Sequence, residues 1–173
     1  MKKFVIICIC CLITTLFLNC SKLSPEITTL RTFPLDSIDG VIDQSGVQFD
    51  RDISSDNKGS LKITARAPAA VKLFEVTDID IENARLIYEA KVRTEGMEGQ
   101  VYLEMWCQFP GKGEFFSRGL QAPASGNTNW MTMQTPFFLK KGEKPEKVRL
   151  NLVVTGKGTA WIDDIRLIKG PLK

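Results

Sequence analysis

Apolar and polar residues alternate along most of the chain beyond residue 46, in short runs separated by clusters of turn residues. The alternation is clearest over residues 85–93, 101–109 and 147–155. The expected inward-facing residues are Leu86, Tyr88, Ala90 and Val92, then Val101, Leu103, Met105 and Cys107, then Val148, Leu150, Leu152 and Val154. A period of two predicts strands with one buried face.

The same criteria predict nine short strands separated by Gly, Pro, Asn and Ser turns. Their expected ranges are 47–53, 60–65, 71–76, 85–93, 101–109, 114–120, 130–139, 147–155 and 159–168. No run has the 3.6-residue spacing of an amphipathic helix. The pattern therefore predicts an all-β chain that folds as an antiparallel β-sandwich or barrel.

The first residues follow a different pattern. Lys2 and Lys3 precede an apolar run over residues 4–18, which is short for a membrane-spanning helix and typical of a secretory signal. The run ends in Phe17-Leu18-Asn19-Cys20, which resembles the lipobox of bacterial lipoproteins, with Phe17 in place of the usual Leu and Asn19 in place of a small residue. An ordinary signal peptide cleaved elsewhere, or an uncleaved anchor, are the alternatives.

The lipoprotein resemblance implies a division of the chain. Residues 1–19 would be a signal peptide, residues 20–32 a lipidated Cys20 with a flexible tether, and residues 33–170 the folded domain. Acylated Cys20, carrying palmitate-type chains, would bind a lipid bilayer. Ser21 follows in place of the Asp that tends to retain such proteins in the inner membrane, which favours the outer membrane of the cell envelope.

Composition excludes several classes of function. Histidine is absent, which removes Ser-His and Cys-His catalytic pairs and the commonest zinc ligand. Without Lys2 and Lys3 the net charge is about +1, so no basic surface for nucleic acid is expected. Cys107 is the only cysteine left after Cys20, so no internal disulfide can form, and its strand position favours a buried apolar role.

The last strand shows a second resemblance. Gly156-Lys157-Gly158-Thr159-Ala160 leads into Trp-Ile-Asp-Asp-Ile-Arg-Leu at 161–167, and Gly59-Ser60-Leu61-Lys62-Ile63 stands earlier. Together with Trp130, Thr135-Pro136-Phe137 and Val148–Leu152, these segments resemble jelly-roll carbohydrate-binding modules and the wider galactose-binding-like sandwich family, over about residues 33–167. The resemblance implies the fold more than a function, because the superfamily includes sugar binders, protein binders and spacers.

Asp163 and Asp164 form an acidic pair in this strand. In the sugar-binding relatives an acidic residue here often helps to hold a structural calcium ion, so the resemblance implies a calcium site with Asp36, Asp39 or Asp50 as partners. Calcium needs six to eight oxygen ligands. The alternative is that the pair accepts hydrogen bonds from backbone amides.

The non-core face of the central strands is the expected binding surface. It would present Tyr102, Glu104, Trp106 and Gln108 beside Glu89, Lys91, Arg93, Arg149 and Asn151, with Arg118, Phe115 and Phe116 at its rim. An aromatic ring among converging polar groups suits a small polar ligand. The resemblance implies a carbohydrate on a concave sheet face. Alternatively, Trp106 is covered and the charges form a solvated surface.

Glu89 and Glu104 could be interpreted as the paired carboxylates of a glycosidase. Lys91 and Arg149 are expected to keep both ionised, which favours an ion-pair network and a protein that is not an enzyme. Two hypotheses remain. One is an envelope-anchored, non-catalytic binding module, and the other is a structural or protein-interaction lipoprotein of the envelope without a small ligand.

Overall fold

A computed structural model describes residues 26–172, so the expected signal segment and Cys20 lie outside the described residues. Nine strands form in this range: β1 Thr28–Phe33, β2 Val47–Asp50, β3 Ser60–Ala65, β4 Ala69–Thr77, β5 Ala84–Phe109, β6 Gly113–Arg118, β7 Ala124–Leu139, β8 Lys147–Val154 and β9 Lys157–Gly170. Residues 26–172 contain no helix, and hence none that could span a membrane.

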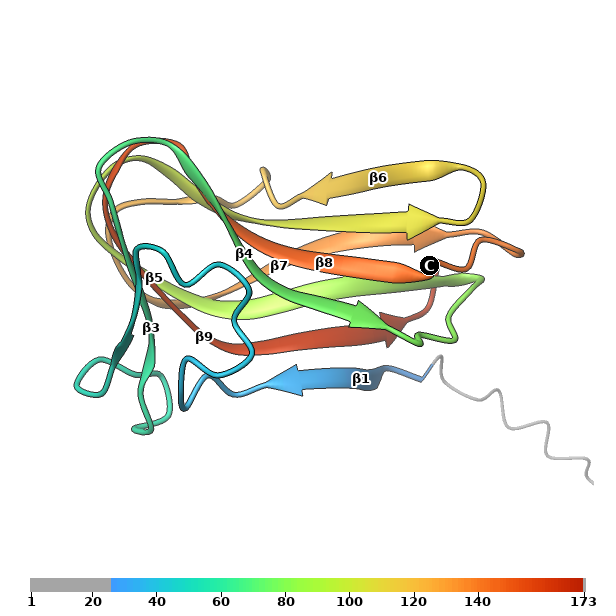
Figure 1. Ribbon diagram of the computed structural model, residues 1–173, viewed down its shortest axis with the longest axis horizontal. Coiled ribbons are helices and arrows are strands. Elements are labelled where there is room, and N and C mark those ends of the chain that lie inside the picture. The colour runs from blue at the N-terminus through green and yellow to red at the C-terminus, as the bar shows by residue number, and fades with distance from the viewer. Residues whose placement is uncertain (1–25, 173) are drawn as a thin grey trace, which may run out of the picture.

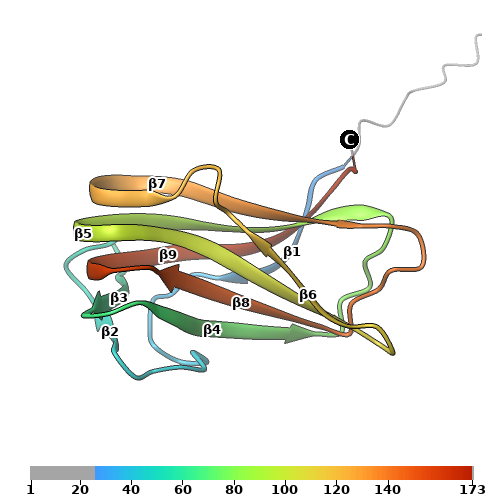
Figure 2. The same cartoon turned by 90° about the horizontal axis from the view of Figure 1, so that it is seen from above.

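The strands pair antiparallel in two layers that share β5 (Figure 1). The first half of β5 lies between β7 and β9, and β9 also pairs with β1 and β3, which in turn pairs with β2. We call this sheet the β9 layer. The second half of β5 lies between β6 and β8, and β8 pairs with β4. We call this sheet the β8 layer. In Figure 2, β4 and β8 lie below β5 and β7 lies above it. The predicted antiparallel β-sandwich is confirmed.

Glycines allow β5 to pass from one layer to the other. Gly99 has a φ of 123°, a conformation that side chains disfavour. Gly156, in the turn between β8 and β9, packs so closely that a Cβ atom would lie 1.6 Å from the carbonyl oxygen of Glu98. The Gly156-Lys157-Gly158 segment of the sequence motif therefore needs its glycines because its backbone packs directly on the backbone at the bend in β5.

The predicted core faces are confirmed. All twelve residues expected to point inward from the three alternating runs are at most 1% exposed. They pack with inward-facing residues of β3 and β9, including Leu61, Ile63, Ile162, Ile165 and Leu167. At one edge of the sandwich, Phe33 of β1 stacks on Phe74 of β4 with ring centroids 4.0 Å apart, which connects the two layers.

The strand boundaries differ from the prediction at two places. Residues 28–32, expected to belong to the tether, form most of β1, because they pair with residues 166–169 of β9. The folded part therefore begins near Thr28 instead of residue 33. The predicted strands 85–93 and 101–109 are one continuous strand, because Gly96 and Gly99 bend the chain without ending its hydrogen bonding.

Candidate functional site

The outer face of the β8 layer brings together the seven residues expected to bind a ligand. Trp106, Glu104, Tyr102 and Gln108 alternate with buried residues of β5, so their side chains share one face. In register with Glu104 lie Asn151 of β8 on one side and Arg118 of β6 on the other. Arg149 lies opposite Trp106. Tyr102 is 8% exposed, so it supports this face from below more than it opens to solvent.

Glu104 is the centre of this face. Trp106 donates its indole N–H to Oε1 of Glu104 at 2.7 Å, Arg118 donates its Nε–H to Oε2 at 2.7 Å, and Asn151 donates its amide to Oε1 at 3.0 Å. We call these four residues the Glu104 cluster. Burial by itself raises the pKa of Glu104, but the three donors and the charge of Arg118 outweigh it and hold the pKa below its ordinary value. Glu104 is therefore an ionised acceptor at neutral pH.

The aromatic part of the site consists of Trp106 and Phe116. Their ring centroids are 5.0 Å apart, and Phe116 is 50% exposed, whereas Trp106 is half-buried. The guanidinium of Arg149 lies 5.7 Å from the centre of the Trp106 ring, and that of Arg118 lies 4.4 Å from the centre of the Phe116 ring. The two arginines thus fix the positions of both rings through cation–π contacts.

One polar residue beside the cluster was not predicted, and one within it lacks a hydrogen-bond partner. Glu114 of β6 pairs with Arg149 at 3.3 Å, a contact that sequence reasoning missed because the register of β6 depends on the hairpin before it. Asn151 is 4% exposed, and its Oδ1 has no hydrogen-bond partner. An unsatisfied buried acceptor costs about 1–3 kcal/mol, so Asn151 is held in place at the expense of some stability.

Glu89, Lys91 and Arg93 do not belong to this surface, and the prediction that placed them there is wrong. They lie on the first half of β5, in the β9 layer, because the chain changes layer between the two predicted strands. Glu89 forms an ion pair with Arg166 of β9 and accepts a hydrogen bond from the side-chain amide of Gln134 on β7. The partners expected for the two glutamates, Lys91 and Arg149, are also replaced, by Arg166 for Glu89 and Arg118 for Glu104.

The positions of Glu89 and Glu104 in different layers argue against the interpretation of these residues as a glycosidase pair. Glu89 and Glu104 belong to different sheets and each has its own arginine, so they do not form a pair of carboxylates that face one substrate. Glu104 is ionised and Cys107 is fully buried, where burial raises the pKa of its thiol to about 12. Neither group is suited to act as a proton donor or a nucleophile.

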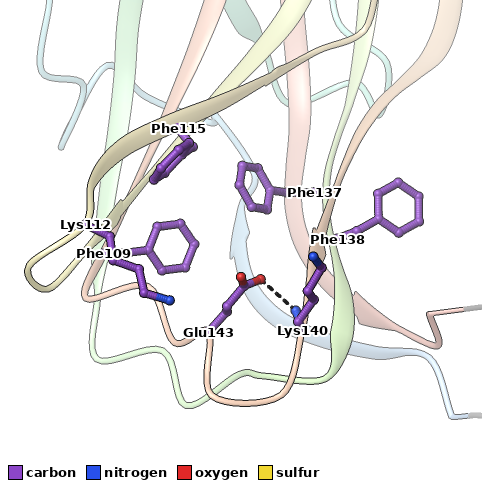
Figure 3. Close-up of a pocket in the computed structure, with 7 residues that line it drawn as sticks. All are labelled: Phe109, Lys112, Phe115, Phe137, Phe138, Lys140 and Glu143. Atoms are coloured by element: carbon purple, nitrogen blue, oxygen red, sulfur yellow. Dashed lines mark hydrogen bonds between the residues drawn. The ribbon is translucent and has the colours of Figure 1, made fainter.

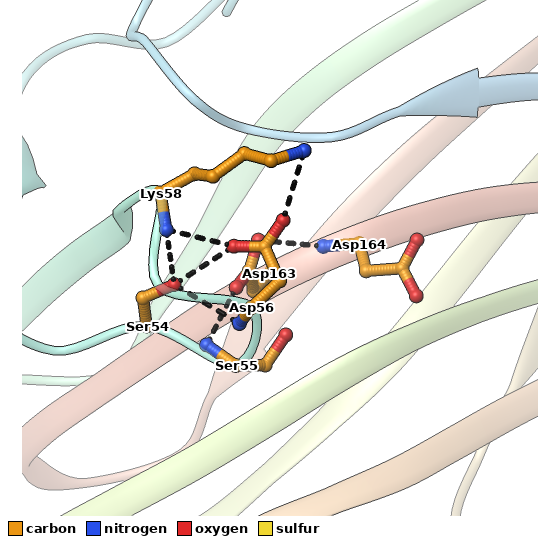
Figure 4. Close-up of polar contacts among 6 residues, drawn as sticks. All are labelled: Ser54, Ser55, Asp56, Lys58, Asp163 and Asp164. Atoms are coloured by element: carbon orange, nitrogen blue, oxygen red, sulfur yellow. Dashed lines mark hydrogen bonds and ion pairs between the residues drawn. The ribbon is translucent and has the colours of Figure 1, made fainter.

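Asp163 and Asp164 do not fit the calcium site that the resemblance implied. Asp163 is fully buried, and its two carboxylate oxygens accept backbone amides, from Ser55 at 2.8 Å and from Asp164 at 2.8 Å (Figure 4). Asp164 points away from it and lies 3.9 Å from Arg166. Among residues 26–172 no group of three potential metal ligands gathers. Asp163 therefore holds the loop before β3 against β9, which is the alternative interpretation.

Two of the three partners predicted for that site, Asp50 and Asp39, have other contacts. Asp50 accepts the indole N–H of Trp161 at 2.9 Å, and this hydrogen bond is the main reason that its pKa is lowered. Asp39 accepts the hydroxyl of Ser37 at 2.9 Å. Lys62 and Arg93 lie over the Trp161 ring, each 5.4 Å from its centre, so this tryptophan is buried beneath two cations.

A groove lies beside the Glu104 cluster and shares Arg118 with it. It has a volume of about 470 Å³ and runs between β6 and β7, lined by Phe116, Ser117, Arg118, Gln121, Pro136, Phe137 and Phe138. Ser117 closes its floor, since its hydroxyl donates to the carbonyl of Pro136 at 2.6 Å. Phe116 and Arg118 line this groove and also contact Trp106 and Glu104, so the groove is continuous with the outer face of the β8 layer.

No protein-family model and no curated protein matches this sequence. Solved structures do. The CBM22-1 xylan-binding domain of Xyn10C from Paenibacillus barcinonensis aligns with a TM-score of 0.63 at 14% identity, over 86% of this chain and 98% of that one. The CBM22-2 xylan-binding domain of the same protein aligns with a TM-score of 0.55 at 9% identity, over 84% and 98%.

A third structure contains a catalytic module as well. The CBM22-1-GH10 modules of the xylanase Xyn10B from Clostridium thermocellum, in complex with xylohexaose, align with a TM-score of 0.52 at 10% identity, over 83% of this chain and 25% of that one. At these identities the likeness shows the fold, which is that of carbohydrate-binding β-sandwich domains. The aligned region makes up 25% of that xylanase chain.

Proposed function

We propose that this protein is a non-catalytic carbohydrate-binding module that holds a glycan on the outer face of the β8 layer. The observation that supports this most strongly is the Glu104 cluster. The buried, ionised carboxylate of Glu104 accepts hydrogen bonds from an indole, a guanidinium and an amide on the same face of the sheet. The exposed ring of Phe116 lies beside them. The fold of the xylan-binding neighbours supports the same class of ligand.

The chemistry of the face suits a sugar. Aromatic rings pack against the apolar faces of pyranose rings, and Arg118 and Gln108 offer polar partners for hydroxyl groups. The groove between β6 and β7 gives room for an extended chain beyond the contact with Phe116. A rigid, hydrogen-bonded cluster loses little conformational entropy on binding, which favours affinity.

The test is isothermal titration calorimetry with xylohexaose and a panel of other oligosaccharides. Trp106→Ala and Glu104→Gln should weaken binding by about 5- to 150-fold, because each removes an interaction worth about 1–3 kcal/mol. The matched control is Glu89→Gln, a buried glutamate with an arginine and an amide partner in the other layer, which should leave binding unchanged. Equal losses in the Glu89 and Glu104 variants, or no binding across the panel, would contradict the proposal.

We propose further that the module is attached to the outer membrane of the cell envelope through an acylated Cys20. The support is the lipobox-like end of the apolar run and the position of Ser21. Mass spectrometry of the protein extracted from membranes should find Cys20 as the N-terminal residue with a diacylglyceryl group. An N-terminus elsewhere, or a Cys20 without acyl chains, would refute the anchor and leave the glycan proposal standing.

A further inference from the structure

Exposed apolar side chains gather at one end of the sandwich. Ile27 is 67% exposed, Phe138 56%, Phe115 49% and Leu172 36%, and these are four of the seven large hydrophobic residues that the described chain exposes. Ile27 precedes β1, Leu172 follows β9, Phe138 lies next to the last residue of β7 and Phe115 lies near the start of β6. We call this group the apolar end.

The strand register places these residues together. The first residue of β1, Thr28, lies opposite Lys169, which lies opposite Leu86, which lies opposite Phe137. Three strand spacings, about 14 Å, therefore separate the start of β1 from the end of β7. In Figure 1 the start of β1, the C-terminal end and the loop between β5 and β6 all lie at the same end of the molecule.

An apolar cavity opens at this end (Figure 3). It has a volume of about 280 Å³, and the rings of Phe109, Phe115 and Phe137 surround it. Phe109 lies 5.9 Å from each of the other two rings, measured between centroids. Lys112 and Lys140 lie at its rim. Glu143, the acidic residue of the lining, accepts the backbone N–H of Lys140 at 2.9 Å.

We propose that the apolar end is a lipid-facing surface, which contacts the bilayer that holds the lipid of Cys20. The inference rests on the proposed anchor. Glu26, the first described residue, comes six positions after Cys20, and six steps of fully extended chain span at most about 22 Å. The chain enters the fold beside Ile27, so a lipid on Cys20 keeps this end of the sandwich near the membrane surface.

The chemistry of the apolar end fits a bilayer interface. Aromatic and aliphatic side chains are stabilised when they leave water and enter the boundary between headgroups and acyl chains. Lysines beside them extend their ammonium groups to the phosphate level. Scattered exposed hydrophobic residues are ordinary, but a group at one end with lysines at its rim marks an interaction surface.

The proposal is tested with the full-length lipidated protein reconstituted in vesicles of phosphatidylethanolamine and phosphatidylglycerol. Phe138→Cys and Ile27→Cys each receive an environment-sensitive NBD dye, and both sites are exposed enough to tolerate the change. The control is Lys157→Cys, whose native side chain is 62% exposed at the first residue of β9, at the other end of the sandwich. Cys107 is buried and will not take the label.

Dyes at Ile27 and Phe138 should fluoresce several-fold more strongly than the dye at Lys157, and nitroxide-bearing lipids should quench only the first two. Equal fluorescence at all three positions, with the protein still floating with the vesicles, would overturn the lipid-facing surface alone. Protein that does not float refutes the anchor and, with it, this inference. A fluorescence increase that follows protein density and not lipid would mean contact between copies of the chain, which also overturns the proposal.

Discussion

Trp106 and Glu104, two residues apart on β5, are joined by an indole N–H that donates to the carboxylate at 2.7 Å. In a strand, residues i and i+2 lie on the same face, so the bond runs along one strand and needs no partner from another. It orients the indole for the contact with Phe116 on β6. The local sequence Glu-Met-Trp therefore specifies the orientation of the aromatic group.

Replacing Trp106 by Phe should separate the effect of this bond from that of the ring. Phe keeps an aromatic ring at this position but has no N–H, so Oε1 of Glu104 loses a donor. A hydrogen bond to a charged group contributes about 1.5–3 kcal/mol to stability. We expect the free energy of unfolding in urea to fall by that amount. Trp130→Phe, at a half-buried position on β7, is the control and should cost clearly less. Equal losses in the two variants would show that the bond contributes nothing specific.

Stability should depend on pH in opposite ways at Glu104 and Asp163. The pKa of Glu104 is lowered in the fold, so its contribution is full above the ordinary value of 4.5 and is lost as the pH falls through the folded pKa. Burial raises the pKa of Asp163, so the folded protein takes up a proton here more readily than the unfolded chain. The resulting stabilisation is full below the ordinary value of 3.8 and is lost as the pH rises through the folded pKa.

Urea unfolding between pH 7 and pH 3 distinguishes the two groups. The stability difference between the wild type and Glu104→Gln should shrink as the pH falls. The difference between the wild type and Asp163→Asn should grow in the same range, because wild-type Asp163 becomes neutral there. Parallel trends in the two variants would contradict the environments described for these carboxyl groups.

Gly156→Ala should be among the most damaging substitutions in the chain. Its Cβ atom would lie 1.6 Å from the carbonyl oxygen of Glu98, and backbone must shift to admit it. The cost should exceed the roughly 1–3 kcal/mol of ordinary overpacking. Gly111→Ala is the matched control, since its φ is 68° but no atom lies within 4 Å of the added carbon. It should cost only about 1 kcal/mol, and similar urea midpoints for the two variants would disprove the close packing at the bend.

Cys107 should resist thiol reagents in the folded protein. Its side chain is fully buried, and burial raises the pKa of the thiol to about 12, so almost no thiolate is present at neutral pH. Incubation with iodoacetamide, followed by mass spectrometry, should show modification only when urea unfolds the protein. Rapid modification without urea would mean that the β8 layer opens far more often than its packing implies.

The alternation of residues predicted the fold class, because a period of two assigns each side chain to a face without reference to other strands. It placed Tyr102, Glu104, Trp106 and Gln108 on one face correctly. It could not say which strands lie beside them. Only the pairing of β5 with β6 and β8 brings Arg118 and Asn151 onto Glu104, and hairpin register is not determined by composition.

The two errors in the strand boundaries, at β5 and at β1, both arise because long-range strand pairing is not visible in the local sequence. Glycines at 96 and 99 are indistinguishable in sequence from a turn between separate strands, yet here they bend one strand across two layers. That bend moved Glu89 away from Glu104. Likewise, nothing in residues 28–32 alternates strongly, because β1 lies at the edge of the sheet and is mostly exposed. Its pairing with β9 is a long-range contact that local pattern does not reveal.

The length of β5 has a consequence for how the domain comes apart. One run of 26 residues provides the central strand of both sheets, so neither sheet can lose its pairing without disturbing the other. Amide hydrogens of Val92 and Leu103, in different layers, should exchange with deuterated solvent through the same global opening and at matching rates. A domain with such a shared strand therefore unfolds as one unit, and neither sheet opens while the other stays closed.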